Sequence, residues 1–263
     1  MRFDIYLKTV TTFCLLFLIT TLSVASNNSV KEHFDPYGSG VVYPEISDGR
    51  TTLVPALNAY PIDNQTVKVD GILDDLVWQK AETAKGFRVW DPNRGDITTR
   101  ETVFKIAYDD DAIYVAFAAY EDDPTKLGDQ LTRRDNITDS DFVGVYLDPY
   151  HDHTTAYNFM VSTAGVLGDR YVYSDGNMDN GWDAVWEAEV SRDEFGYYGE
   201  YRIPFSAFRF KHSDSMTWGL NVYRFMHRHG EDTGWTIWDK ETRGFVSRFG
   251  ELRGLDGIPK KQT

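Results

Sequence analysis

Short apolar segments recur along this chain with turn residues between them, and this pattern constrains the fold more than any other feature. Each segment has the length of one strand, and most alternate apolar with polar or small residues. The segments include ETVFKIAYD (101–109), AIYVAFAAYE (112–121), DFVGVYLD (141–148), AYNFMVST (156–163), VLGDRYVYS (166–174), VWEAEVS (185–191), YYGEYRI (197–203) and FGELRG (249–254). Helix patterns occur only at 74–84 and 204–210. We therefore predict an all-β fold, an antiparallel β-sandwich of the immunoglobulin-like or jelly-roll-like kind with one or two short helices.

The segments also predict which strands are central and where hairpins form. Residues 112–121 are apolar almost throughout, as expected of a central strand. In 141–148, apolar side chains at alternate positions form one face of a strand. Ala164-Gly165 and the stretch RDEFG (192–196) each join two such segments, so both are predicted to be hairpin turns.

The first 25 residues have the pattern of a secretory signal peptide. Arg2 and Lys8 precede an apolar run centred on FCLLFLITTL, which is too short to span a bilayer comfortably, and the small residues Ser23-Val24-Ala25 follow it. We expect cleavage after Ala25 and export to the periplasm, the cell surface or the extracellular medium. An uncleaved anchor helix is the alternative.

The remaining chain divides into three expected parts: a polar leader at 26–61, the sandwich domain at 62–255 and a linker stub at 256–263. The only cysteine, Cys14, lies in the predicted signal peptide, so the exported domain has no disulfide. It must be stabilised by its hydrophobic core, alone or together with a metal.

The charge of the chain excludes some partners. A net charge of −14 should repel nucleic acid and anionic lipid, whereas neutral sugars and cations such as calcium are compatible with it. The aromatic content of 15% fits aromatic packing within sheets and also stacking on sugar rings. Composition alone does not choose between these two roles.

The acidic stretch VDGILDDLVWQKAE allows a structural and a catalytic interpretation. Asp70, Asp74 and Asp75 lie within six residues of one another and precede Trp78. Acidic residues before an apolar helix face are common helix caps, and Gly71 suits a turn, so we favour a turn and a capped helix that closes one end of the sandwich.

Four motifs, in order along about residues 62–255, resemble the family 9 carbohydrate-binding modules. They are VDGILDDLVWQKAE, TVFKIAYDDDAIYVAFAAYEDDP, DSDFVGVYLDPYHD and SRFGELRG. The resemblance implies a secreted, calcium-containing β-sandwich that binds oligosaccharide or polysaccharide, is associated with glycoside hydrolases, and has a non-catalytic role in carbohydrate catabolism. The chain also resembles the N-terminal domain of exported proteins with a predicted outer-membrane barrel. That likeness implies covalent continuation into, or docking on, such a barrel, with a structural role and no sugar binding as the alternative.

The resemblance also implies where a sugar would bind. Family members clamp the ring between two tryptophans, and these positions fall near Asn136 or Ile137 and near Arg243 or Phe245. The family's glutamate, arginine and asparagine correspond by position to Gly144, Met160 and Ser162. The family's clamp is therefore absent at the matching positions.

Other residues could replace this clamp. Trp90 lies in FRVWDPNRGD and Trp182 in NMDNGWD, two stretches rich in turn residues, and aromatic faces in loops can stack on sugar rings. Arg133 and Arg134 lie beside the DSDF strand start, where the family's cleft would be. We predict sugar contacts from these four residues.

A possible calcium site lies in YSDGNMDNGWDAVWE. Asp175, Asn177, Asp179 and Asp183 occupy alternate or nearly alternate positions, as in the first half of an oxygen-ligand calcium loop. The glycine, Gly181, comes one place late and no glutamate stands at the twelfth position. A calcium site and a solvated acidic turn both remain open.

A glycoside hydrolase is the third possibility. It would need two carboxylates about 5 to 10 Å apart, and Glu187, Glu189 and Glu200 lie on neighbouring predicted strands. Cross-strand charge pairs that also involve Arg202 explain the same residues more simply. We predict no catalytic residues and no catalytic activity by the chain itself.

Overall fold

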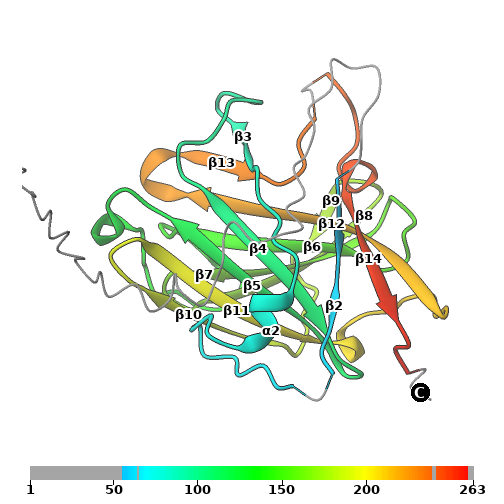
Figure 1. The fold of residues 1–263 in the computed structure, drawn as a ribbon. Coiled ribbons are helices and arrows are strands. Elements are labelled where there is room, and N and C mark those ends of the chain that lie inside the picture. Colours follow the sequence, from blue (N-terminus) through cyan, green and yellow to red (C-terminus); the bar gives the residue numbers. More distant parts are fainter. Residues whose placement is uncertain (1–54, 64, 239–240, 260–263) are drawn as a thin grey trace, which may run out of the picture.

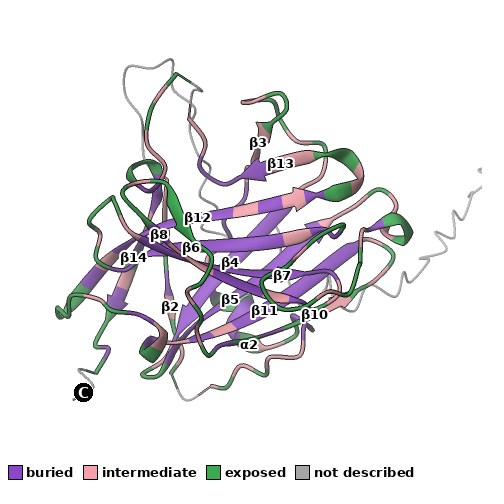
Figure 2. Cartoon of the chain, turned by 180° about the vertical axis from the view of Figure 1, so that it is seen from behind, coloured by how far each residue is buried: buried purple, intermediate pink, exposed green. Residues whose placement is uncertain are grey.

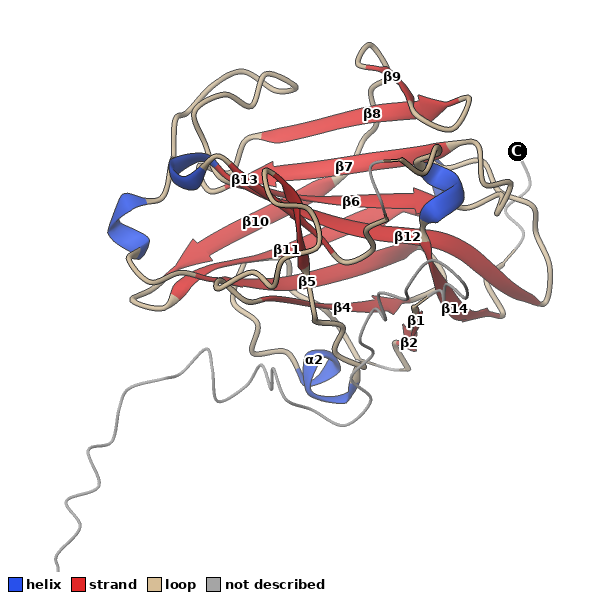
Figure 3. Cartoon of the chain, turned by 90° about the horizontal axis from the view of Figure 1, so that it is seen from above, coloured by secondary structure: helices blue, strands red, loops and turns tan. Residues whose placement is uncertain are grey.

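The computed structural model describes residues 55–63, 65–238 and 241–259, and these form two packed sheets (Figures 1 and 3). The larger sheet has, in spatial order, β1 (Ala56–Asn58), β14 (Gly250–Asp256), β12 (Ser215–Met226), β6 (Phe142–Asp148), β7 (Ala156–Ser162), β8 (Leu167–Tyr173) and β9 (Asn177–Asp179), with β13 (Glu231–Gly234) paired to β12 and β3 (Arg88–Asp91) paired to β13. The smaller sheet has β10 (Glu187–Arg192), β11 (Gly196–Pro204), β5 (Ala112–Tyr120), β4 (Thr102–Tyr108) and β2 (Tyr60–Pro61). The predicted β-sandwich is confirmed.

Helical structure is limited to short pieces. The prediction at 74–84 becomes the five-residue helix α2 (Leu76–Lys80), because the backbone is extended from Ala81 and Ala84 then pairs with Phe104 of β4. The prediction at 204–210 becomes a single 3₁₀ turn, η2 (Phe205–Ala207). The other 3₁₀ turns are η1 (Pro124–Lys126), η3 (His227–His229) and η4 (Val246–Arg248). None of the helices in the described ranges is long and apolar enough to cross a membrane.

Strands β4 and β5 of the smaller sheet are buried on both faces, which explains their mostly apolar sequences (Figure 2). In β5, alternate residues enter the core between the sheets: Ile113, Val115, Phe117 and Ala119. The residues between them face outward and contact a second cluster that includes α2: Ala112, Tyr114, Ala116 and Ala118. The position of β5 at the centre of its sheet confirms the prediction from residues 112–121.

The predicted alternation is present in the larger sheet, and each sheet contains one of the two predicted hairpins. Val143, Val145 and Leu147 of β6 all face the inter-sheet core. The β7–β8 connection turns at Gly165, which has a φ of +74°. The β10–β11 connection follows residues 193–195, where Asp193 accepts hydrogen bonds from the amides of Phe195 and Gly196.

The acidic stretch wraps around one buried carboxylate, that of Glu200 on β11. One of its oxygens accepts hydrogen bonds from the amides of Asp70 and Gly71, at 3.0 Å each, and the other accepts from Trp78 Nε1 at 2.7 Å. Gly71 has a φ of +76°, and an added Cβ would lie 2.7 Å from the backbone of Val190, so only glycine fits this turn. The stretch is structural, as the favoured interpretation held.

Two details of that interpretation are wrong. Helix α2 covers the outer face of the smaller sheet and does not close one end of the sandwich (Figure 3). Asp75 occupies the N-cap position without a side-chain cap bond, and its carboxylate accepts a hydrogen bond from the amide of Lys68. It therefore fastens the chain that leads into the helix.

The sandwich begins before the expected boundary at residue 62. β1 pairs in parallel with β14 of the larger sheet, and β2 pairs in parallel with β4 of the smaller sheet. These two pairings depart from the otherwise antiparallel order. The predicted signal peptide and most of the predicted leader lie outside the described residues.

Candidate functional site

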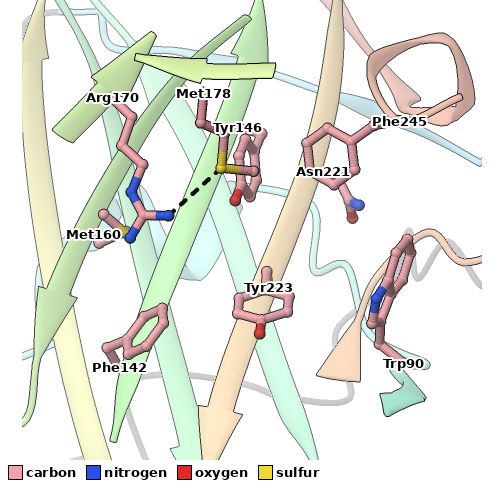
Figure 4. A pocket seen from close by; sticks show the side chains of 9 residues that line it. All are labelled: Trp90, Phe142, Tyr146, Met160, Arg170, Met178, Asn221, Tyr223 and Phe245. Carbon is pink, nitrogen blue, oxygen red and sulfur yellow. Dashed lines mark hydrogen bonds between the residues drawn. The ribbon is translucent and has the colours of Figure 1, made fainter. Parts of the chain in front are cut away.

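A pocket of about 220 Å³ lies on the outer face of the larger sheet, on the side away from the inter-sheet core (Figure 4). Strands β6, β7, β8, β9 and β12 form its floor and one side, and the segments around β3 and η4 form the other side. It is lined by Trp90, Phe142, Tyr146, Met160, Arg170, Met178, Asn221, Tyr223 and Phe245.

A cross-strand row that contains two glycines produces the hollow. From β12 to β8 the consecutive partners in this row are Tyr223, Gly144, Met160 and Gly168. Neither glycine carries a side chain that would fill the surface, and the flexible side chain of Met160 is the nearest neighbour of both, because an added Cβ at either one would be 3.1 Å from a Met160 atom. Gly144 and Met160 are two of the positions matched above to polar residues of the family's cleft. The third matched position, Ser162, is buried and does not line the pocket.

Trp90 forms one wall, and contacts with Arg94 and Trp238 hold its ring in place. The guanidinium of Arg94 lies 4.0 Å from the centre of its ring, and Trp238 meets the ring edge-to-face at 4.4 Å. Arg94 also donates hydrogen bonds to the carbonyl oxygens of Trp90 and Trp238. Of the four predicted sugar contacts, Trp90 is the one that the structure places in the pocket.

Phe245 forms the adjoining wall, and Asp175 holds it there. One carboxylate oxygen of Asp175 accepts hydrogen bonds from the amides of Phe245 and Ser247, at 2.9 and 2.8 Å, and the other accepts from the Ser247 hydroxyl at 2.7 Å. Phe245 is one of the two residues matched above to the second clamp position. Asp175, predicted as a calcium ligand, here positions an aromatic wall of the pocket.

Two tyrosines on the floor offer hydroxyl groups. Burial raises the pKa of Tyr146 to about 12, and burial followed by the nearby carboxylate of Asp232 also raises the pKa of Tyr223. The Tyr146 hydroxyl can donate a hydrogen bond to a ligand, whereas the Tyr223 hydroxyl already lies against the Asp232 carboxylate. The Asn221 amide is already engaged, because it accepts from the Thr236 amide at 2.9 Å and donates to the Thr236 carbonyl at 3.3 Å.

Trp182 lies on the opposite side of the larger sheet from Trp90. Its ring packs on Tyr157 at 5.0 Å and on Phe159 at 5.8 Å, centre to centre. Both belong to the inter-sheet core and alternate along β7 with Met160, which faces the pocket. The structure does not bring the two predicted tryptophans together.

The two predicted arginines also lie outside the pocket. Arg134 pairs with the buried carboxylate of Asp169, donates to the carbonyl of Ala184 at 2.8 Å and lies 3.3 Å from Asp183. Arg133 is exposed and forms no ion pair with any described residue. Arg134 therefore stabilises the loop that carries it, and Arg133 faces solvent.

The structure does not bring the four predicted calcium ligands together. The hydrogen bonds already described occupy both oxygens of Asp175, and Asp183 pairs with Arg134. Asp179 accepts from the Gly181 amide at 2.9 Å, and Asn177 is exposed at the start of β9. Calcium needs six to eight convergent oxygens, whereas within the described ranges these aspartates form no group that could share an ion.

One other group among the described residues, Glu121, Asp122 and His229, has the spacing of metal ligands. Three guanidinium groups surround it. Arg224 lies 2.7 Å from Glu121, Arg228 lies 3.0 Å from Asp122, and Arg100 lies 3.3 Å from both acids. These positive charges already neutralise the carboxylates and would repel a cation, so the group is an ion-pair network.

The three glutamates weighed for hydrolysis do not share a cleft. Glu200 is fully buried beneath the VDG turn, and burial raises its pKa to about 7. Glu187 is exposed and pairs with Arg202 at 3.4 Å, which confirms one predicted cross-strand pair. Glu189 lies opposite Glu200 in register, so the second predicted charge pair is absent.

Several pocket residues were missed from the sequence: Phe142, Tyr146, Arg170, Met178, Asn221 and Tyr223. A usable signal existed in FVGVYLD, because Phe142, Gly144 and Tyr146 alternate with the predicted core residues and must share the outer face. An aromatic outer face around a glycine is unusual for a solvated surface. The other lining residues depend on strand order, which the sequence alone does not provide.

Three solved structures share this architecture. A family 9 carbohydrate-binding module from Caldicellulosiruptor kristjanssonii in complex with glucose is 18% identical, with a TM-score of 0.56 over 75% of this chain and 94% of that chain. A family 9 carbohydrate-binding module from the same organism in complex with cellotriose is 17% identical, with a TM-score of 0.53 over 75% of this chain and 92% of that chain. A Bacteroides uniformis protein provisionally described as carbohydrate-binding is 17% identical, with a TM-score of 0.55 over 75% of this chain and 98% of that chain. At these identities the likeness establishes the fold.

The sequence comparison agrees with the fold. The family described as carbohydrate family 9 binding domain-like matches residues 69–253, which is more than half of the chain. A search of curated proteins found no similar sequence. The match covers most strands of both sheets and confirms the resemblance seen in the four motifs. The chain is therefore a member of the carbohydrate family 9 binding domain-like family.

Proposed function

We propose that this chain binds an oligosaccharide or the end of a polysaccharide in the pocket on the larger sheet, with a non-catalytic role in polysaccharide binding and catabolism. The observation that carries this proposal is the aromatic pocket lined by Trp90, Tyr223 and Phe245, at the position matched to the family's cleft. Aromatic faces suit the C–H faces of sugar rings, and tyrosine hydroxyls suit their hydroxyl groups.

The size of the pocket supports binding of a single sugar ring. Pockets for drug-sized ligands have volumes of about 300–1,000 Å³, and this one has about 220 Å³. Its walls come from two well-anchored segments, since Arg94 fixes Trp90 and Asp175 fixes the turn that carries Phe245. A preformed site of this kind loses little conformational entropy on binding.

Isothermal titration calorimetry with glucose, cello-oligosaccharides and xylo-oligosaccharides tests the proposal. We expect saturable binding that weakens at least about tenfold in Trp90→Ala, a loss of about 1.4 kcal/mol, while the melting temperature changes little because Trp90 is only half-buried.

Trp182→Ala is the matched control, because it removes the same side chain from the opposite side of the larger sheet. It should lower the melting temperature and leave the affinity unchanged. If no sugar binds the wild-type protein, or if Trp90→Ala binds as well as wild type, the proposed site is wrong and a structural or docking role is favoured.

Export by a cleaved signal peptide and attachment to an outer-membrane protein remain predictions that N-terminal sequencing and cell fractionation would test. Calcium also remains a prediction. Melting curves with calcium and with a chelator test it, and a chelator effect that disappears in Asp179→Asn would locate the ion in the predicted loop. The geometry of that loop leads us to expect no chelator effect there.

A further inference from the structure

Arg170 is a charged side chain in an otherwise aromatic, thioether and amide lining. It lies on β8, and Figure 4 shows its guanidinium pointing into the pocket from the side opposite Trp90. No other lining residue carries a charge, so the lining has a net charge of +1 on a chain whose net charge is −14.

The hydrogen-bonding capacity of Arg170 is almost unused. Among the described residues its guanidinium has one hydrogen bond, to the sulfur of Met178 at 3.6 Å, and thioether sulfur is a weak acceptor. Other arginines of this protein differ: Arg224 lies 2.7 Å from Glu121, and Arg202 lies 3.4 Å from Glu187. A guanidinium offers five donors in a planar fork that matches a carboxylate or a sulfate.

The other polar groups in the pocket do not favour a neutral sugar over an anionic one. The Asn221 amide is engaged by the backbone of Thr236. The remaining neutral polar groups of the lining are the hydroxyls of Tyr146 and Tyr223. No lining residue is an acid, and the carboxylate nearest the floor, that of Asp232, lies against the Tyr223 hydroxyl. Within aromatic walls the charge of Arg170 is screened less than at an open surface, which strengthens its attraction for an anion.

We propose that this pocket selects a sugar residue that carries an anionic oxygen group, with Arg170 binding the anion while the ring lies against the Trp90 and Phe245 side. The shared chemistry is a pyranose with a carboxylate, as in a uronic acid, or with a sulfate ester. The inference rests on the proposed function, because it assigns the ligand class of the same site.

Calorimetry with matched monosaccharides tests the inference: glucose, glucuronate, the methyl ester of glucuronate, and glucose 6-sulfate. We expect at least one anionic sugar to bind wild type about tenfold or more tightly than glucose and the ester, with a preference that decreases as salt increases. In Arg170→Gln the anionic sugar and glucose should bind with the same affinity, so the preference for the anion is lost. Arg170→Lys should retain part of the preference.

Arg133→Gln is the control, because it removes the same charge from an exposed arginine outside the pocket. It should change neither affinity. Preference for glucuronate alone identifies a uronic acid, and preference for both anions identifies charge as the selected property. If wild type binds glucose as tightly as every anionic sugar, or if Arg170→Gln keeps the preference, the inference is wrong and the proposed function stands. If neither neutral nor anionic sugars bind, both fail together.

Discussion

The outer faces of the two sheets differ in what lies against them. On the smaller sheet, the chain covers its own surface with α2, and the buried carboxylate of Glu200 receives three hydrogen bonds from the segment above it. On the larger sheet, the η4 turn packs beside the pocket, and among the described residues Arg170 has no carboxylate partner. Both faces carry an ionisable group among apolar side chains, but within the part of the chain that the structure describes only Glu200 has a full set of hydrogen bonds.

This difference separates stability from recognition. A buried charge with its hydrogen bonds complete contributes to a unique fold, whereas a charge that lacks a partner is available to a ligand. Substitutions on the smaller sheet should therefore change the free energy of unfolding and leave sugar affinity intact. Substitutions around the pocket should change sugar affinity and leave the free energy of unfolding nearly unchanged. The predictions below test that separation, from the largest expected effect to the smallest.

Trp78→Ala should have the largest effect. It removes a fully buried indole and the hydrogen bond to Glu200, and such changes cost about 3–5 kcal/mol of unfolding free energy. Urea denaturation measures the loss. Trp78→Phe keeps most of the packing and should cost less, so it preserves a folded protein for the affinity measurement. An altered sugar affinity in Trp78→Phe would contradict the separation of the two faces.

Glu200→Gln should lower stability by about 1–3 kcal/mol, because an amide cannot accept all three hydrogen bonds and buried unpaired donors cost that much. It should also change the pH dependence. Burial raises the pKa of Glu200 from 4.5 to about 7, so the folded protein holds this proton more tightly than the unfolded chain.

The stability linked to that proton is fully present below pH 4.5 and is lost as pH rises through about 7. We expect wild type to lose on the order of 3 kcal/mol through this group across the interval, and Glu200→Gln to lack that component. Denaturation of both proteins at pH 5 and pH 7.5 measures the difference. Parallel pH profiles for the two proteins would show that Glu200 does not titrate in this range.

Asp175→Gly should weaken sugar binding severalfold, which corresponds to about 1 kcal/mol. Glycine tolerates the φ of +60° at this position but removes the carboxylate that fixes the turn carrying Phe245. Asp175→Asn keeps an acceptor and should lose less affinity. A chelator that reproduced the glycine phenotype in wild type would instead point to a calcium role for this residue.

Asp75→Asn should have the smallest effect, a loss of about 0.5–1 kcal/mol in unfolding free energy, since its bond to the Lys68 amide is exposed. The amide oxygen can still accept that bond. Sugar affinity should not change. Thermal unfolding measures the shift, and a loss of binding without loss of stability would revive the catalytic interpretation of the acidic stretch.

Local sequence patterns predicted much of the fold. The buried faces of β5 and β6 follow directly from apolar alternation, and the two hairpins follow from Gly165 and from Asp193 with its glycine partner. These features depend on residues close in sequence. The length of α2 was overestimated because the pairing of Ala84 with Phe104, a contact between distant segments, ends the helical region early.

The site depends more on distant contacts, so less of it could be predicted. Trp90 and Trp182 both lie in turn-rich stretches, and only the strand order shows that they are on opposite sides of the larger sheet. Asp175 lies in a plausible calcium pattern, yet its partners come from residues 245–247. The role of Glu200 likewise depends on donors about 130 positions away.

The parallel pairing of β1 with β14 affects how this domain bears mechanical load. Both strands run in the same direction, with Ala56 beside Glu251 and Asn58 beside Arg253. Tension applied to the chain before β1 and after β14 would pull the strands past each other lengthwise, so their hydrogen bonds would have to break together. Antiparallel neighbours pulled apart from one end separate one bond at a time. A force that acts on this domain through the chain on both sides of it would therefore meet its stronger direction.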